Sequence, residues 1–402
     1  MKVMAAPSWH FDSKRTKRNQ LQYGIAATKR PLIVFVILIA VGFPADGVSI
    51  VLADETTIAA PNLKDIAETV IAQPGEAVGM QAPVTDPEEV QLTFGSQAIL
   101  DRCWSPKELE GSSQDKWITK SVGAKSRPFP EKTLPKNTLK TLPAEFQNSI
   151  RSVKPRDNLK PVALTFDLCE GAGEITGYDA DIVNYLRRNQ VKATFFVSGK
   201  WMLSHSEKTM QLMADPLFEI GNHGWAHRNF RTLDTQRIGE EVLWTQAQYE
   251  LLWEELAAKP CAKSVSLEEL LKIPKVPLTF RFPFGTCSKE ALDFLARSGL
   301  PAVQWRVVTG DAALRQPASG ISREILEKMR PGSIIICHAN GRGHATAEAL
   351  PLFIPKLLQS GYQFVTISEL LASGSVSAVS ECYETKPGDN LRYDRISGVG
   401  KK

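Results

Sequence analysis

The sequence predicts an α/β fold built on a parallel sheet, either open or closed into a barrel. Between residues 161 and 367, short apolar runs rich in β-branched and aromatic residues alternate with helical stretches. Repeated alternation of this kind is typical of parallel sheets, whose strands are joined by crossover helices. Polar residues follow several of the apolar runs, and α/β proteins place functional residues at the carboxyl ends of their strands. We therefore expect a functional site at that edge of the sheet.

Seven strands and six main helices are expected in this α/β region. The first strand is the clearest, because Lys160 and Pro161 keep the chain extended before an apolar run. The strands are expected at residues 162–166, 193–197, 219–222, 278–281, 302–308, 332–337 and 363–366. The helices are expected at residues 178–189, 206–213, 235–258, 289–298, 321–329 and 347–360, with a further short helix inside an insertion at residues 261–277.

The N-terminal region has the parts of a secretory signal. A basic flank precedes a short apolar run at residues 31–43, and small residues follow near Ala53. The apolar run is short for a membrane span, which needs about 20 residues. Export with cleavage near Ala53 is therefore favoured over an uncleaved membrane anchor. In either case the rest of the chain is expected outside the cytoplasm, in a periplasmic or extracellular location.

The chain is expected to have four parts. They are the signal or anchor at residues 1–53, a Pro-rich and weakly structured segment at 54–155, the α/β domain at 156–372 and a polar tail at 373–402. Within the weakly structured segment, residues 97–104 and 117–122 hold enough apolar side chains to dock on a neighbour. In the tail, only Cys382 and Tyr383 are expected to act as anchors.

Composition and cysteine content exclude several classes of function. The net charge is +4 and the basic residues are scattered, which argues against a nucleic-acid partner. Six cysteines without a CxxC pair suit disulfides in an oxidising compartment rather than a structural zinc site. A disulfide between Cys169 and Cys287, which each follow a predicted strand, would stiffen the mouth of the site. A nucleophilic cysteine is the alternative.

Acidic residues and histidines follow two of the predicted strands. Asp167 and Glu170 come at the end of the first strand, where a carboxylate is a better catalytic candidate than one on a helix surface. His223 and His227 follow the strand at 219–222. Two histidines spaced i, i+4 on a helical turn can bind one metal ion, whereas the alternative is a pair of ordinary surface histidines.

Three further strand ends carry residues suited to chemistry. Arg281 opens the sequence Arg-Phe-Pro-Phe-Gly and is well placed to hold a carboxylate. Asp311 follows the strand at 302–308 and could orient a histidine. His338 follows the buried strand at 332–337, where a core histidine with a satisfied ring is the alternative. His344, farther along, is expected to be solvated.

In chain order these residues resemble the five motifs of the polysaccharide deacetylase family, which has the NodB homology domain and is carbohydrate esterase family 4. The resemblance covers residues from about 160 to 372. Its motifs are Thr165-Phe166-Asp167, His223-Gly224-Trp225-Ala226-His227, Arg281-Phe282-Pro283-Phe284-Gly285, Trp305 through Asp311, and Ile336-Cys337-His338. It implies a deformed (β/α) barrel. The roles that it implies are general base for Asp167, metal ligand for His223 and His227, support of the base for Arg281, orientation of the acid for Asp311 and catalytic acid for His338.

Three positions depart from the family pattern. Leu168 stands where the family has a second aspartate that binds the metal. Asp167, Glu170 or water would then complete the ligand set with the two histidines. Gly224 replaces a serine or threonine that braces the histidine loop, and Ala312 replaces a tryptophan that walls the substrate groove. These differences bear on metal affinity and substrate preference rather than on the fold.

The resemblance implies hydrolysis of N-acetyl groups from an exported polymer of N-acetylhexosamine, either peptidoglycan or a chitin-like glycan. A divalent ion, most simply Zn²⁺ on imidazole ligands, would polarise the acetyl carbonyl and activate a water. Asp167 would take a proton from that water, His338 would protonate the departing amine, and backbone N–H groups near Phe284 would bind the oxyanion. One alternative is the same fold acting on O-acetyl esters or non-sugar amides. Another, which Leu168 favours, is a non-catalytic glycan-binding protein with a degraded metal site.

Overall fold

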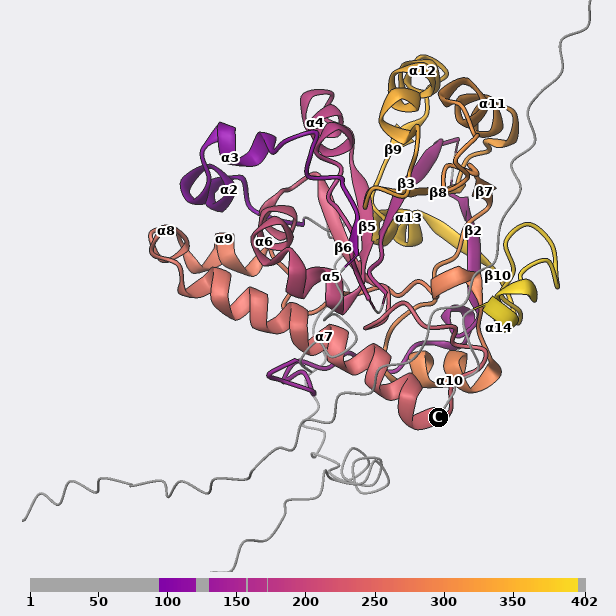
Figure 1. Cartoon of the computed structure of the whole chain (residues 1–402), viewed down its shortest axis with the longest axis horizontal. Helices are drawn as coiled ribbons and strands as arrows, with labels where there is room; N and C mark the ends of the chain where they lie inside the picture. The colour runs from indigo at the N-terminus through magenta and orange to yellow at the C-terminus, as the bar shows by residue number, and fades with distance from the viewer. Residues whose placement is uncertain (1–93, 121–129, 157, 172, 397–402) are drawn as a thin grey trace, which may run out of the picture. The chain divides into compact units, whose positions relative to one another are not determined.

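Six of the strands form one parallel sheet (Figure 1). The structure is a computed structural model that describes residues 94–396 except 121–129, 157 and 172. The strand order is β6–β5–β3–β8–β7, with β9 paired to β3, and all pairs are parallel. These strands are β3 (Pro161–Leu168), β5 (Ala193–Val197), β6 (Phe218–Asn222), β7 (Val307–Val308), β8 (Ile334–His338) and β9 (Gln363–Phe364). All eight residues of β3 are buried, as expected for a strand covered on both faces.

Single bridges, rather than a continuous ladder, link the two edges of this sheet. Phe280 is bridged to Asn222 at the end of β6 and, on its other side, to Ala302. The segment that starts at Ala302 leads into β7, which pairs with β8. The predicted strands at 278–281 and 302–308 are therefore shorter than expected, and Pro283 and Pro301, which lack an N–H, lie beside them. The α/β class is confirmed, with the barrel in the deformed form that was expected.

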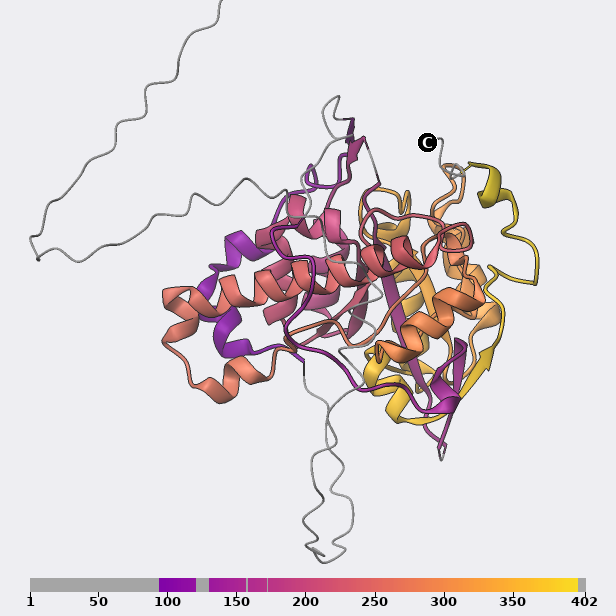
Figure 2. The ribbon, with the colours of Figure 1, turned by 90° about the horizontal axis from the view of Figure 1, so that it is seen from below.

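The main helices lie where the sequence predicts them. They are α4 (Ala180–Arg188), α6 (Ser206–Ala214), α7 (Thr235–Ala258), α10 (Lys289–Arg297), α11 (Ala318–Lys328) and α12 (Thr346–Gln359). Side chains at the N-caps fix the starts of α4 and α7, where Asp179 and Asp234 accept backbone N–H groups. Figure 1 shows α4, α12 and α11 side by side along the sheet, and Figure 2 shows α7 crossing it. Short helices complete the set: α5 (Gly199–Ser204), α8 (Pro260–Lys263), α9 (Leu267–Leu271) and α13 (Ile367–Ala372).

The hydrophobic core follows from the apolar faces of these elements. On α4, Ile182, Val183 and Leu186 are fully buried in the largest cluster, which also contains Phe166 and Phe195 of the sheet. Burying one such side chain stabilises the fold by roughly 1.5–3 kcal/mol relative to exposing it. The helices are therefore held against the sheet mainly by this cluster, which leaves the carboxyl ends of the strands to carry polar residues.

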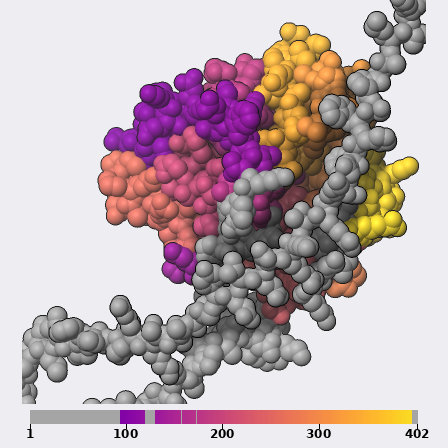
Figure 3. Space-filling model, in the orientation of Figure 1, coloured from indigo at the N-terminus to yellow at the C-terminus, as the bar shows by residue number. Residues whose placement is uncertain are grey.

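The described residues of the range 94–155, which are 94–120 and 130–155, form more regular structure than the sequence predicts. The elements here are α2 (Gln97–Cys103), α3 (Pro106–Glu110), β1 (Thr119–Lys120), the 3-10 helix η2 (Ala144–Phe146) and β2 (Ser149–Pro155). The predicted docking of residues 97–104 is confirmed, because Ile99, Leu100 and Trp104 are buried and a disulfide joins Cys103 to Cys261. Figure 3 shows α2 and α3, in indigo, lying beside α8 and α9, in salmon. Part of the second predicted segment, 117–122, also docks, because β1 pairs antiparallel with β4 (Glu174–Ile175), although the Trp117 side chain itself is 71% exposed.

The tail is also more ordered than expected. Strand β10 (Gly374–Val379) pairs antiparallel with β2, so both segments extend the folded domain beyond residues 156–372. Ile150 and Val153 on β2 are both buried, but the β2–β10 register shifts between Ser152 and Ile150, so no strict alternation marks this strand in the sequence. The anchoring role of Cys382 and Tyr383 is confirmed: a disulfide joins Cys382 to Cys287, and the Arg151 guanidinium lies 4.0 Å from the Tyr383 ring centre.

Two other expectations concern the cysteines and the N-terminus. A disulfide between Cys169 and Cys287 is wrong, because Cys287 pairs with Cys382 and Cys169 is a buried free thiol, as is Cys337. The predicted signal or anchor at residues 1–53 lies outside the described residues. Among the residues that the structure describes, no helix is both long enough and apolar enough to cross a membrane.

Candidate active site

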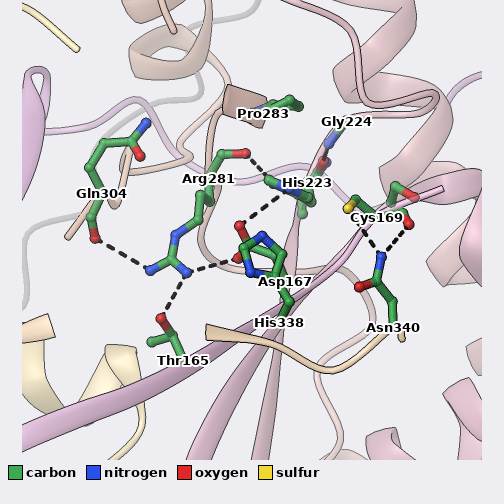
Figure 4. A network of polar contacts seen from close by, with 12 residues as sticks. Thr165, Asp167, Cys169, His223, Gly224, Arg281, Pro283, Gln304, His338 and Asn340 are labelled. Atoms are coloured by element: carbon green, nitrogen blue, oxygen red, sulfur yellow. Dashed lines mark hydrogen bonds and ion pairs between the residues drawn. The ribbon is translucent and has the colours of Figure 1, made fainter. Parts of the chain in front are cut away.

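Asp167 and His338 lie side by side on neighbouring strands. Strands β3 and β8 are parallel, and Asp167 is the register partner of His338. Register partners on adjacent strands share one face of the sheet and are separated by about 4.8 Å in the hydrogen-bonding direction. Figure 4 shows both side chains next to His223 and Arg281. The structure thus gathers at one strand edge four residues that are separated by up to 171 positions in the sequence, the difference between 167 and 338.

Arg281 is the buried centre of a hydrogen-bond network around Asp167. The Arg281 side chain is fully buried, and its Nη1 atom donates to Asp167 Oδ1 at 2.9 Å and to Thr165 Oγ1 at 2.7 Å. Its remaining donors reach the backbone carbonyls of Val303 and Gln304, and the guanidinium stacks on Phe196 at 4.0 Å. Burial lowers the pKa of Arg281 while Asp167 opposes that shift, and an arginine remains cationic in either case. The network fixes one carboxylate oxygen of Asp167.

The loop after β6 brings His223 and His227 together without a helical turn. Their ring centres are 5.1 Å apart. The predicted helical spacing is wrong, because Gly224 and His227 both have left-handed backbone conformations, with φ of 71° and 53°. A glycine suits this conformation since it lacks the Cβ that disfavours it. The loop is therefore a tight irregular turn that nevertheless places the two imidazoles face to edge.

Two polar side chains brace this loop in place of the serine or threonine that Gly224 replaces. Asn222 Oδ1 accepts the backbone N–H of Gly224 at 2.9 Å. Glu241 Oε2, from α7, accepts the backbone N–H of Ala226 at 2.9 Å. Both side chains are buried, so these hydrogen bonds are shielded from competition with water. The long helix α7 thereby contributes directly to the position of the two histidines.

His223 presents an unpaired ring nitrogen to Asp167. Its Nδ1 atom lies 2.8 Å from the carbonyl oxygen of Arg281, so the ring proton is on Nδ1 and is donated to that oxygen. Its Nε2 atom is buried without a hydrogen-bond partner and lies 3.5 Å from Asp167 Oδ2. Burial lowers the pKa of His223, and burial together with His223 and His338 lowers the pKa of His227 well below its usual range. Both rings are therefore neutral and can offer a lone pair.

These residues fit a divalent ion. A buried imidazole nitrogen facing a carboxylate oxygen leaves two lone pairs opposed, and a cation between them would satisfy both. Two ligands of a tetrahedral Zn²⁺, each about 2.0–2.1 Å from it, are about 3.4 Å apart, close to the 3.5 Å between His223 Nε2 and Asp167 Oδ2. Among residues 94–396 as described, however, no three His, Cys, Asp or Glu side chains are grouped closely enough to be recognised as a complete ligand set.

Glu170 and Leu168 do not join the histidine pair. The Glu170 carboxylate accepts the backbone N–H of Thr176 at 3.2 Å and the hydroxyl of Ser204 at 2.8 Å. It is buried and holds its own turn together. Leu168 lies in the largest hydrophobic cluster and is fully buried. Asp167 is accordingly the carboxylate whose position fits a third ligand, since Glu170 is used elsewhere.

Asp311 orients His338 through two hydrogen bonds. Asp311 Oδ1 lies 2.9 Å from His338 Nδ1, and Oδ2 accepts the His338 backbone N–H at 2.7 Å. Thr346 donates its hydroxyl to the same Oδ2 at 2.7 Å. Burial opposes ionisation of both groups, but their mutual attraction outweighs it, so the pKa of His338 is raised and that of Asp311 is lowered. The His338 side chain is 20% exposed, which leaves its ring open to a substrate.

The free cysteines are not suited to nucleophilic chemistry. Burial raises the pKa of Cys169 to about 12, and burial raises the pKa of Cys337 well above its usual range. Asn340 holds Cys169 in place by donating to its carbonyl oxygen at 2.7 Å and to its sulfur at 3.2 Å. The cysteine alternative raised by the sequence therefore has no support in this geometry. His344 is exposed, as expected.

Sequence reasoning missed three residues that position the site. Thr165 holds Arg281, Glu241 holds the histidine loop, and Thr346 holds Asp311. Thr165 carried a signal, because it lies two residues before Asp167 on a strand and so shares its face. Glu241 and Thr346 carried none, because they lie on helices whose packing against the site depends on the tertiary fold.

Comparisons with known proteins show which proteins this chain is similar to. Residues 154–303 match the family model described as polysaccharide deacetylase. The chain is 29% identical over 211 residues to the peptidoglycan-N-acetylglucosamine deacetylase PgdA of Listeria monocytogenes, covering 52% of this chain and 39% of that protein. It is 26% identical to a chitooligosaccharide deacetylase of Bradyrhizobium, covering 52% of this chain and 90% of that protein. A solved structure of a CE4 family pseudoenzyme from Bacillus anthracis is 26% identical, with a TM-score of 0.45, and the match covers 57% of this chain and 71% of that one. The chain thus spans less than half the length of the Listeria relative.

Proposed function

From the match of residues 154–303 to the polysaccharide deacetylase model and from the geometry of the site, we propose that this chain is a metal-dependent hydrolase that removes N-acetyl groups from a polymer of N-acetylhexosamine. The observation that carries the proposal is the pairing of Asp167 with His338 beside the unpaired Nε2 of His223. The relatives named for peptidoglycan and for chitooligosaccharides support a peptidoglycan or chitin-like substrate. Peptidoglycan lies in the cell wall, so we propose an exported protein whose residues 1–53 serve as signal or anchor.

Asp167 is the proposed general base. Its Oδ1 atom is held by Arg281, whereas its Oδ2 atom faces the histidine pair. A carboxylate fixed through one oxygen keeps the other oriented toward a water that attacks the acetyl carbonyl. The Asp167 side chain is only 6% exposed, so the proton transfer takes place away from bulk solvent. Arg281 supplies the opposite charge that compensates the burial of this carboxylate.

His338 is the proposed general acid. Its Nδ1 proton is donated to Asp311, which directs Nε2 away from that carboxylate. The raised pKa of His338 increases the protonated fraction near neutral pH, and the protonated ring can donate to the nitrogen of the departing amine. Asp311 thereby acts as a positioning residue, because it fixes the ring and stabilises its charge without contact with the substrate.

His223, His227 and Asp167 are the residues that would hold the metal ion, with Zn²⁺ as the simplest candidate for imidazole ligands. When bound, the ion would supply Lewis-acid polarisation of the acetyl group and of water. The chain itself supplies the orientation of those ligands through the Arg281 carbonyl, Asn222 and Glu241. A backbone N–H near Phe284 remains the proposed site of the oxyanion.

Acetate release distinguishes this function from the alternatives. Purified protein is incubated with tetra-N-acetylchitotetraose, with peptidoglycan and with acetylated xylan, each with and without a chelator. The proposal predicts acetate from one or both of the N-acetylated substrates, lost with the chelator and restored by Zn²⁺. Release from xylan alone would instead favour an esterase. Glycan binding without any acetate would favour the non-catalytic alternative, which Leu168 supports because it removes a possible ligand.

A further inference from the structure

The C-terminal segment at residues 382–394 packs against both loops that form the site. It lies outside residues 154–303, which match the family model. The disulfide between Cys382 and Cys287 joins it to the loop that follows Arg281. Asn390 is fully buried and donates to the carbonyl oxygen of Gly285 in the same loop. The segment is thus fixed to the turn that carries Phe284.

The same segment also grips the loop after the two histidines. Arg231 Nη1 donates to both carboxylate oxygens of Asp394, at 3.0 and 3.2 Å, and Asn229 donates to Asp394 at 2.7 Å. Arg231 Nη2 donates to Asn390 Oδ1 at 2.6 Å. Asn229 and Arg231 follow His227 by two and four residues. Four side chains therefore connect the tail to the histidine loop.

A row of aromatic rings runs from the tail to the histidine pair. Tyr393 packs on Phe284 with ring centres 5.1 Å apart, and the Phe284 and His227 rings meet edge to face with their centres 4.3 Å apart. Among the described residues, only three that are not glycine have a positive φ, and His227 and Phe284 are two of them. Such backbone conformations are unfavourable and persist only where the surroundings enforce them. The tail therefore contacts both the loop that contains His227 and the loop that contains Phe284.

We propose that residues 382–394 form a disulfide-anchored brace that positions His227, through Tyr393 and Phe284, for metal binding. The proposal rests on the proposed function, because it assigns His227 as a ligand. Residues that orient a metal ligand without touching the ion commonly change metal affinity by 10–100-fold when they are replaced. Tyr393 and Phe284 have that relation to His227, and the disulfide and the Asp394 contacts hold Tyr393 in place.

The first test measures the Zn²⁺ affinity of the full chain by competition with a chelating dye. Tyr393→Ala is expected to weaken Zn²⁺ binding by about tenfold, whereas Tyr393→Phe keeps the ring and is expected to stay within about twofold of the unmodified protein. Tyr362→Ala, which removes a half-buried tyrosine next to β9, is the matched control and is expected to leave the affinity unchanged. Equal Zn²⁺ affinity in Tyr393→Ala and in the unmodified protein would overturn the proposal.

The second test does not depend on the metal. Amide hydrogen exchange is measured on the metal-free protein for peptides covering residues 223–231 and 282–287. A double Cys287→Ser and Cys382→Ser variant is expected to speed exchange in both peptides, and a double Cys103→Ser and Cys261→Ser variant, which removes the other disulfide, is not. Unchanged exchange in the first variant would overturn the brace. If the Cys287→Ser and Cys382→Ser variant exchanges faster but the unmodified protein binds no Zn²⁺, the result would support the brace and contradict the proposed metal-dependent function.

Discussion

The carboxylate of Asp311 holds His338 at two points, the ring Nδ1 at 2.9 Å and the backbone N–H at 2.7 Å. One carboxylate therefore fixes both the end of strand β8 and the rotation of the imidazole. The same contact stabilises the protonated ring, because a buried negative charge lies next to it. The acid of the proposed reaction is thus oriented and charged by a single neighbour, which makes the pair a suitable target for substitution.

Replacing Asp311 by Asn should change the pH dependence of deacetylation. His338 must be protonated to act as an acid, so activity is expected to fall as the pH rises through its pKa. Asp311 is the charge that raises this pKa, so in Asp311→Asn the alkaline fall should begin at lower pH, with activity at neutral pH reduced by about 10²-fold. A pH profile of kcat/KM measures both effects. Asp293→Asn, on the exposed face of α10, is the control, and an alkaline limb that does not move in Asp311→Asn would contradict the assignment.

The Asp311–His338 pair should also stabilise the metal-free fold over a limited pH range. The pKa of Asp311 is lowered on folding, so its contribution is present above its ordinary value of 3.8 and is lost as the pH falls through the folded value. The pKa of His338 is raised, so its contribution is fully present below 6.5 and is lost as the pH rises through the folded value. The difference in Tm between the unmodified protein and a double Asp311→Asn, His338→Gln variant should therefore be largest between about pH 4 and 6.5. A difference that is constant from pH 4 to 9 would show that the pair is not ionised as described.

Arg281 should matter more for stability than any other polar residue of the site. Arg281→Met would leave the Asp167 carboxylate buried without its charged partner, and breaking a buried ion pair in this way costs about 3–5 kcal/mol. Adding Asp167→Asn to that variant removes the unpaired charge and should recover part of the loss. Urea unfolding of the single and double variants measures the free energies. A double variant that is less stable than Arg281→Met would show that the charge is not the cause.

Zinc binding should identify the third ligand. Asp167→Asn, His223→Ala and His227→Ala are each expected to weaken Zn²⁺ binding by at least about tenfold. Glu170→Gln should leave the affinity within about twofold, since this carboxylate is bound by Thr176 and Ser204 instead. Competition with a chelating dye gives all four affinities. If Glu170→Gln weakened binding as much as Asp167→Asn did, Glu170 would be the ligand and the turn would have to rearrange.

The fold could be predicted well where it depends on local patterns. The helix at 235–258 and the strand at 193–197 match their predicted limits, because caps and apolar runs mark their ends. Strands β2 and β10 were missed, since each gains its stability from a partner more than 200 residues away, as the pairing of Ser152 with Ser377 shows. Sequence alone could not show that pairing.

The residues of the site also fall into those that local sequence patterns predict and those that depend on the tertiary fold. Asp167, Arg281 and His338 were found because each follows an apolar strand, and the structure brings them together. The proximity of His223 and His227 was predicted correctly, but the reason given for it was wrong. Their loop is held by left-handed residues and by Glu241 rather than by a helical turn. The disulfide partners Cys287 and Cys382 could not be assigned from sequence, because many pairings of six cysteines are possible.

The central claim is that Asp167 activates water for deacetylation at this strand edge, and acetate release by Asp167→Asn tests it most directly. The substitution keeps the shape of the side chain and its contact with Arg281 but removes the base, so with enough Zn²⁺ to saturate the variant, turnover of the N-acetylated glycan that the unmodified protein cleaves should still fall by at least about 10²-fold. Circular dichroism should show that the fold is kept. Turnover equal to that of the unmodified protein, in a folded Asp167→Asn protein, would contradict the account.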